Sequence, residues 1–270
     1  MENFSEYSYK IYGKKNGTVG SYIRAIQILD YIFSQYDVLH LNGKSLTSIT
    51  DASEIYSIYE FVKCEEKKMR ANEDSIFKYG KENQTSYPLD RFCSAAVGFL
   101  YKYRISIVEN EATILTKKAH DKNDLIRALN RIASISNTEV DTEVYQRIGQ
   151  SAFRCVLIEI YNCQCCVCGL NIKDLLRASH ILPWTENKKN RLNPENGLCL
   201  SATYDAAFDR NLISFDEDYR MVVSTQIKEY YSNEATKDYF HKYEGKKLIL
   251  PYKFYPNKEF LQKHIEKLIV

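Results

Sequence analysis

The chain has 270 residues, of which 44% are hydrophobic and 27% are charged, so it can bury the cores of two domains. Its formal net charge of +2 at pH 7 neither requires nor excludes a nucleic-acid partner, because basic groups can be clustered locally. No secretory signal, membrane-spanning stretch, Walker lysine loop or dinucleotide fingerprint is visible, so we expect a cytoplasmic protein that binds no membrane and whose chemistry is not driven by ATP or NAD.

The N-terminal part is predicted to be helical. Residues 18–33 and 91–103 both carry apolar side chains at helical spacing. Residues 51–54, Asp-Ala-Ser-Glu, have the pattern of a capping box that opens a further helix. Residues 65–88 are polar and include a glycine and a proline, so the sequence predicts a loop there.

A connection is predicted over residues 105–140. Polar groups at residues 109–111, 120–123 and 137–139 interrupt the apolar pattern, with a short helix at residues 125–135 between them.

We therefore place a domain boundary near residue 140. Residues 1–140 are predicted to form a helical domain for DNA recognition, sensing or dimerisation, and the sequence does not choose between these roles. Residues 141–270 are predicted to form a second domain, which opens with a long amphipathic helix at residues 143–160.

Three short segments of the second domain carry chemistry. Residues 179–184 are Ser-His-Ile-Leu-Pro-Trp, residues 193–200 are Asn-Pro-Glu-Asn-Gly-Leu-Cys-Leu, and residues 204–209 are Tyr-Asp-Ala-Ala-Phe-Asp. They bring one histidine, one asparagine and a carboxylate pair into about thirty residues, with a turn-rich loop between them.

The local structure of these segments follows from their residue types. His180 follows a small apolar run and is predicted to end a short strand, because Pro183 cannot donate to a ladder. Asn196 stands where a second strand should begin. Residues 204–210 are predicted to form a short helix with Asp205 and the aspartate four residues later on one face.

The order and spacing of these residues resemble the ββα-metal module of the HNH endonucleases. The flanks at residues 153–169, 211–216 and 243–264 resemble those of predicted bacterial restriction endonucleases with an HNH domain, so the likeness spans residues 145 to 270. It implies an α+β protein in which a helical N-terminal domain precedes a ββα-metal (HNH) nuclease domain with a C-terminal hairpin and helix.

The resemblance assigns roles that suit phosphodiester hydrolysis. The reaction needs a base to deprotonate water and a cation to neutralise charge on the phosphorane. His180 suits the base, because the pKa of imidazole lies near neutrality. In the family, the residue at the place of Asn196 braces the loop and orients the histidine backbone, and the helix supplies ligands for the metal. Asp205 would then help to hold Mg²⁺ or Mn²⁺.

The sequence departs from the family pattern in two places. Ser179 stands where the family often has an acidic or histidine metal ligand. The last histidine of the motif is absent, and Tyr204 and Asp205 occupy the two places where it is found. A carboxylate is a good ligand for a hard cation, so Asp205 is the expected replacement, with Ser179 and Tyr204 as further candidates. Loss of the metal site by drift is the alternative.

Four cysteines are clustered between residues 163 and 168. Cys165-x-x-Cys168 has the pattern of half a zinc knuckle. Cys199 is the candidate third ligand of a structural zinc, and Cys163 is a candidate fourth. The alternative is a set of small core residues with free thiols, since this pattern does not suggest disulfides.

Basic residues flank the histidine. Arg177 precedes it, and Lys188, Lys189 and Arg191 lie in the loop that follows, where they can contact DNA phosphates. A solvated surface loop explains each of them equally well when taken alone.

The sequence therefore predicts a metal-dependent endonuclease of the restriction type that cleaves double-stranded DNA and acts as a homodimer to cut both strands. Three alternatives stay open. The enzyme can depend on a modified base, it can be triggered by a ligand of the N-terminal domain, or it can be a catalytically dead DNA-binding protein that keeps the HNH fold.

Overall fold

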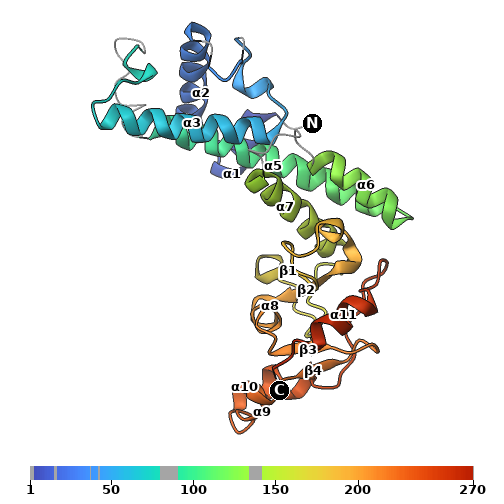
Figure 1. Cartoon of the computed structure of the whole chain (residues 1–270). Coiled ribbons are helices and arrows are strands. Elements are labelled where there is room, and N and C mark those ends of the chain that lie inside the picture. Colours follow the sequence, from blue (N-terminus) through green and yellow to red (C-terminus); the bar gives the residue numbers. More distant parts are fainter. Residues whose placement is uncertain are drawn as a thin grey trace. The chain divides into compact units, whose positions relative to one another are not determined.

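The computed structural model describes six stretches of the chain, which are residues 3–14, 17–36, 38–41, 43–79, 91–133 and 142–269. The chain divides into two compact units. The N-terminal unit comprises Met1–Ile107 and Ile135–Tyr145, and the C-terminal unit comprises Val108–Ser134 and Gln146–Val270. Figure 1 labels their elements along the chain. No helix in the described stretches is long and apolar enough to cross a bilayer.

The N-terminal unit is built from helices, as predicted. Two of them begin at side-chain caps: Asn3 forms a capping box with Glu6, and the Asp51 carboxylate accepts hydrogen bonds from the amides of the next helix. The helical elements are α1 (Phe4–Tyr12), α2 (Gly17–Gln35), η1 (Leu46–Ser48), α3 (Ala52–Arg70), η2 (Ile76–Tyr79) and the first part of α5 (Phe92–Lys118).

The core of this unit joins α1, α2, α3 and α5. Aliphatic side chains from α2 and α3, such as Leu29 and Ile58, are fully buried. The ring of Phe99 on α5 lies 5.9 Å from the ring of Phe4 on α1 and 5.6 Å from that of Tyr22 on α2, measured between centroids. Aromatic packing therefore ties the first two helices to α5.

The predicted loop at residues 65–88 is wrong at its start, because residues 65–70 belong to α3. Glu65 and Glu66 are buried there. Their carboxylates accept hydrogen bonds from the amides of Ile76 (3.0 Å) and Ser94 (2.9 Å). Glutamates are usually expected at the surface, but here their carboxylates accept hydrogen bonds from backbone amides of later segments. Residues 80–90, with the glycine and the proline of the prediction, lie outside the described residues.

The predicted break at residues 109–111 is also wrong, because α5 continues through it to Lys118. The run from residue 105 to 118 contains neither glycine nor proline, and Ala112 and Thr116 are buried on one face of the helix. The polar side chains of residues 110 and 111 lie on the exposed side of the helix. The predicted short helix is present as α6 (Lys122–Ala133). Residues 137–139 lie outside the described residues.

The C-terminal unit combines helices with two small antiparallel sheets. β1 pairs with β2, with Ala178 opposite Cys199, and β3 pairs with β4 as a hairpin. The fold class predicted from the sequence is confirmed. The elements after α6 are α7 (Thr142–Ile160), η4 (Lys173–Leu175), β1 (Leu176–His180), η5 (Lys188–Asn190), η6 (Pro194–Asn196), β2 (Gly197–Ser201), α8 (Ala202–Asp209), β3 (Ile213–Phe215), β4 (Met221–Val223), α9 (Thr225–Lys228), α10 (Glu234–Tyr239), η7 (His241–Tyr243) and α11 (Lys258–Ile265).

Close packing fixes β2 against α7. A Cβ atom at Gly197 would lie 2.5 Å from Leu157 Cδ1 and 2.5 Å from Phe153 Cζ, so a larger residue fits there only if these side chains of α7 shift. Gly197 follows Asn196 directly, and this contact therefore sets the start of the second strand.

A buried histidine holds the last helix. His264 on α11 lies 2.9 Å from Ser214 Oγ through its Nδ1 atom, and its ring stacks on Phe208 at a centroid distance of 3.7 Å. Burial lowers the pKa of His264 to about 4. The folded protein therefore keeps this imidazole neutral at a pH where an exposed histidine is protonated.

We predict that His264 makes the C-terminal unit sensitive to acid. Because the folded-state pKa of His264 lies below the unfolded value of about 6.5, stability is present above pH 6.5 and is lost as the pH falls toward 4. Between pH 7 and pH 5 the wild type should lose about 2 kcal/mol more than His264→Gln. Urea unfolding followed by the fluorescence of the single tryptophan, Trp184, measures this difference. Equal losses in the two proteins would contradict it.

Candidate active site

His180 is the last residue of β1, as predicted, and two aromatic rings hold its side chain. The ring of Phe153 from α7 stacks on the imidazole at a centroid distance of 3.9 Å and an interplanar angle of 15°. Trp184 contacts the imidazole edge-on at 5.4 Å. These contacts fix the orientation of a side chain that is still partly exposed.

One nitrogen of His180 is already engaged. Its Nε2 atom lies 2.9 Å from the backbone carbonyl oxygen of Arg191. A carbonyl oxygen can only accept, so Nε2 carries the proton and Nδ1 of the neutral ring is left as the acceptor. Burial lowers the pKa of His180, although the hydrogen bond to Arg191 acts in the opposite direction. The imidazole is therefore neutral at pH 7, the form that can take up a proton.

Asn196 closes the loop that follows His180. Its Oδ1 atom accepts a hydrogen bond from the Leu182 amide at 2.8 Å, and its Nδ2 atom donates to the carbonyl oxygens of Leu182 (3.1 Å) and Asn190 (3.2 Å). The Ile181 amide donates to the Asn196 carbonyl at 3.0 Å. The side chain is only 1% exposed. One buried amide thus satisfies three backbone groups on both sides of the loop.

Two carboxylates of α8 lie near the histidine. Asp205 accepts a hydrogen bond from the Ser179 hydroxyl, which stands one residue before His180 on β1. Burial, followed by the negative charge of Asp205, raises the pKa of Asp209. Two carboxylates whose charges repel each other form a place where a divalent cation is favourable.

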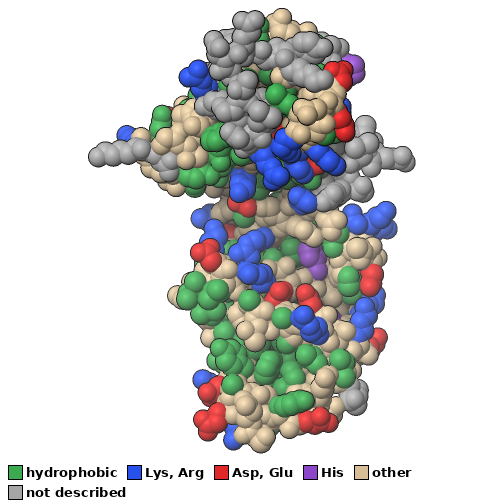
Figure 2. Space-filling model, turned by 90° about the vertical axis from the view of Figure 1, so that its left-hand side faces the viewer, with side chains coloured by type: hydrophobic (Ala, Val, Ile, Leu, Met, Phe, Trp, Pro, Cys, Tyr) green, Lys and Arg blue, Asp and Glu red, His purple; other side chains and the backbone are tan. Residues whose placement is uncertain are grey.

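These side chains share a cavity of about 450 Å³. In the space-filling view, histidine, acidic and basic side chains gather on one face of the C-terminal unit (Figure 2). The residues that line the cavity are Gln150, Phe153, Arg154, Arg177, Ala178, Ser179, His180, Pro183, Trp184, Asp205 and Asp209.

Tyr204, one of the three candidate metal ligands, does not line this cavity. Its ring is 1% exposed and lies edge-on to Phe240 and Tyr243, and its hydroxyl donates to the Tyr239 carbonyl at 2.5 Å. Consecutive residues of a helix point about 100° apart, so Tyr204 and Asp205 cannot both face β1. Tyr204 is a packing residue here, and Asp205 and Ser179 remain as the candidates.

The four basic residues that were expected to contact DNA differ in their position relative to the cavity. Arg177 is exposed and lines the cavity. Lys188 and Lys189 are exposed on η5, and neither lines the cavity. Arg191 donates from Nε to the Trp184 carbonyl at 2.8 Å, and its guanidinium lies 5.1 Å from the centre of the Trp184 ring. It therefore holds the loop that supplies the carbonyl for His180.

The cysteine cluster forms a tight turn. The Cys165 amide donates to Leu170 and the Gly169 amide donates to the Cys165 carbonyl, so Cys165 and Cys168 share one knuckle. A hydrogen bond from the Cys168 thiol lowers the pKa of Cys165 to about 6. Across residues 142–269 and the other described stretches, no group of three or more histidine, cysteine or acidic side chains is placed to hold a metal. Cys199 is buried and does not complete a zinc site with this pair.

The sequence reasoning did not select several residues of the cavity. Asp209 lies four residues after Asp205 on a predicted helix, and this spacing is the sequence signal that points to it. Gln150, Phe153 and Arg154 come from α7, which lies far back in the sequence. Only the packing of α7 against β1 and β2 brings them to the cavity.

Comparison with protein families supports an HNH-type domain in this part of the chain. Residues 165–216 match the HNH endonuclease family model, and this range covers about a fifth of the chain and includes β1, β2, α8 and β3. This match and the geometry above support a nuclease. No curated protein matches the chain.

Removal of the Asn196 amide should destabilise the C-terminal unit. Asn196→Ala removes the hydrogen-bond partners of the buried Leu182 amide and carbonyl, so we expect a loss of about 2–4 kcal/mol in the free energy of unfolding. Asn187→Ala is the matched control, because Asn187 accepts a single side-chain hydrogen bond from Asn190 and should cost less than about 1 kcal/mol. Urea titration followed by tryptophan fluorescence measures both. Similar values for the two variants would show that other contacts close the loop.

Proposed function

We propose that this protein is a metal-dependent endonuclease that cleaves double-stranded DNA, and that it belongs to the restriction type that acts on foreign DNA. The observation that carries the proposal is a neutral imidazole with a free Nδ1 atom in the same cavity as a carboxylate pair, inside a segment that matches the HNH endonuclease family. A base and a cation site side by side are what phosphodiester hydrolysis requires.

In this proposal His180 activates the attacking water. Its Nδ1 atom takes a proton from water while the oxygen attacks phosphorus, and the bond between phosphorus and the 3′ oxygen breaks. The departing 3′ oxygen takes a proton from solvent, and the imidazolium returns its proton to solvent. The products carry 5′-phosphate and 3′-hydroxyl ends. The Arg191 carbonyl holds the protonated Nε2 atom, so the ring cannot turn away during the transfer. Asn196 keeps the backbone of residues 181 and 182 in place.

The donor set of the cavity fits Mg²⁺ or Mn²⁺. Hard cations prefer oxygen ligands, and Mg²⁺ is commonly held by one or two carboxylates together with water and substrate phosphates. Asp205 would hold the ion with Asp209, and the Ser179 hydroxyl would orient the Asp205 carboxylate. When bound, the cation would neutralise the charge that develops on the departing oxygen.

Basic side chains around the cavity would bind the DNA phosphates next to the one that is cleaved. Arg177 is exposed at the cavity, and Lys188 and Lys189 are exposed on the loop that follows the histidine. One centre cuts one strand, so cleavage of both strands would require two copies of the chain, for which a homodimer is the simplest arrangement.

A second candidate is a DNA-binding protein that keeps the HNH fold without catalysis. The observation that favours it is Ser179, whose hydroxyl engages Asp205 at a place where the family often has a metal ligand. The experiments below separate the two candidates.

The first experiment tests cleavage. Purified wild-type protein is incubated with unmethylated phage DNA and with cytosine-methylated DNA, each with Mg²⁺, Mn²⁺ or EDTA. We expect metal-dependent fragments, and a loss of at least about 100-fold in rate for His180→Ala, because the base is removed. His241→Ala, which replaces an exposed histidine, is the control and should cut like the wild type.

The DNA that is cut also decides the type of enzyme. Cleavage of unmethylated DNA supports restriction, and cleavage of methylated DNA alone supports dependence on a modified base. If the wild type binds both DNAs but cuts neither with any metal, the catalytic proposal fails and the binding protein replaces it.

The second experiment tests the metal site separately from cleavage. Mn²⁺ binding to the protein without DNA is measured by titration calorimetry. Asp205→Asn should weaken binding by at least about tenfold, because a neutral amide loses most of the attraction for a divalent cation. Asp238→Asn, on the exposed side of α10, is the matched control and should bind like the wild type. Equal affinity in all three proteins would place the metal elsewhere.

A further inference from the structure

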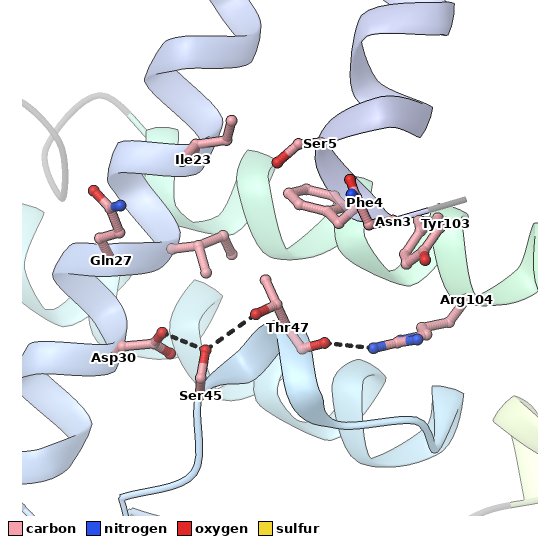
Figure 3. Close-up of a pocket in the computed structure, with 11 residues that line it drawn as sticks. Asn3, Phe4, Ser5, Ile23, Gln27, Asp30, Ser45, Thr47, Tyr103 and Arg104 are labelled. Atoms are coloured by element: carbon pink, nitrogen blue, oxygen red, sulfur yellow. Dashed lines mark hydrogen bonds between the residues drawn. The ribbon is translucent and has the colours of Figure 1, made fainter. Parts of the chain in front are cut away.

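The N-terminal unit contains a cavity of about 480 Å³ that plays no part in the proposed nuclease chemistry. Its walls come from the start of α1, the middle of α2, the segment around η1 and α5 (Figure 3). The volume lies in the range of sites for small molecules.

A buried cation forms one end of the cavity. Arg104 on α5 is only 9% exposed, and its guanidinium donates to the Thr47 carbonyl at 2.7 Å. Its Nε atom is buried and has no hydrogen-bond partner. Within the described stretches no carboxylate lies within ion-pair distance of Arg104, and its nearest electrostatic support is the Tyr103 ring at 5.1 Å. Arginine stays protonated in proteins, so a buried positive charge is left without a counter-charge.

The start of α1 faces the same space. Asn3, Phe4 and Ser5 line the cavity, and Figure 3 shows them on the same side of it as Arg104. The first-turn amides of a helix have no partners within the helix, and they favour an anion. The Asn3 side chain accepts from the Glu6 amide, and the Glu6 carboxylate accepts from the Asn3 amide. Glu6 is thus a negative group near this end, which disfavours a highly charged polyanion.

A hydrogen-bond acceptor lies at the opposite end of the cavity. The Asp30 carboxylate on α2 accepts hydrogen bonds from the Ser45 hydroxyl (2.7 Å) and the Leu46 amide (2.8 Å), as Figure 3 shows for Ser45. Between the two ends the wall includes the apolar side chains of Ile23 and Ile26 beside the polar side chain of Gln27. A complementary ligand has an oxyanion at one end, an apolar body and a hydrogen-bond donor at the other end.

We propose that this cavity binds a small organic oxyanion, with its carboxylate or phosphate group against Arg104 and the start of α1 and its donor group toward Asp30. Such a group would neutralise the guanidinium charge of Arg104, which lines the cavity and has no carboxylate beside it among the described residues. A DNA backbone phosphate is the less suitable occupant, because Arg104 is nine-tenths buried and lies inside a concave site.

Calorimetric titration of the full chain tests this site. The probes are acetate, inorganic phosphate, the four ribonucleoside 5′-monophosphates with their uncharged nucleosides, and apolar α-amino acids. We expect at least one organic anion to bind at least tenfold more tightly than acetate or inorganic phosphate, and a bound nucleotide to lose at least tenfold without its phosphate. The nucleotide and amino-acid arms distinguish a phosphate from a carboxylate ligand.

Variants of the protein test whether the ligand binds at Arg104. Arg104→Gln should weaken binding by at least tenfold, whereas Lys102→Ala, an exposed cation on the same helix, should have no effect. Ser5→Asp provides a second variant that should fold, since an acidic residue in the first turn suits a helix, while its carboxylate competes for the site.

The proposal is overturned if none of the probes binds, or if binding persists in both Arg104→Gln and Ser5→Asp. It is also overturned if only short duplex DNA binds and Arg104→Gln weakens that binding, because the cavity then serves a DNA phosphate. Each of these results is independent of whether the protein cleaves DNA.

Discussion

The C-terminal unit depends on the closure of one loop. The amide of Asn196 bonds the backbone at Leu182 and Asn190, and this loop also supplies the Arg191 carbonyl that engages His180. The histidine is therefore fixed by the backbone on one side and by the Phe153 ring on the other. A base that is held in one tautomer and one orientation loses little freedom when it acts, so the loop is the structural origin of the proposed chemistry.

The carboxylates of the site are placed by the packing of α8, and their shared negative charge favours a cation. The packing of α8 against β1 places Ser179 beside Asp205, and a spacing of four residues places Asp209 on the same helix face. Burial and like charge make this pair costly without a cation. The same reasoning applies to Arg104 in the N-terminal unit, where the uncompensated charge has the opposite sign. In both units a charge that is not balanced by an opposite charge marks the place where a ligand is favourable.

Much of this arrangement follows from local patterns. The strand that ends at His180, the start of the second strand after Asn196 and the short helix with Asp205 depend on residues that are close in the sequence. The errors have a common origin in contacts over long separations. Glu66 is buried because it accepts from the Ser94 amide, and the polar stretch near residue 110 stays helical because Ala112 packs inside. Residues from α7 reach the cavity only through tertiary packing, so no local pattern could select them.

The two departures from the HNH pattern differ in their consequences. Tyr204 has left the metal side of α8, and its ring fills the space between Phe240 and Tyr243, so it supports the fold rather than the chemistry. Ser179 has kept its position beside the site and donates to Asp205, which orients that carboxylate. A hydroxyl that directs a ligand can preserve a cation site that has lost one direct ligand, since water and phosphate oxygens supply the remaining contacts to Mg²⁺. In the proposed nuclease, the carboxylate pair of α8 would hold the cation without the absent histidine.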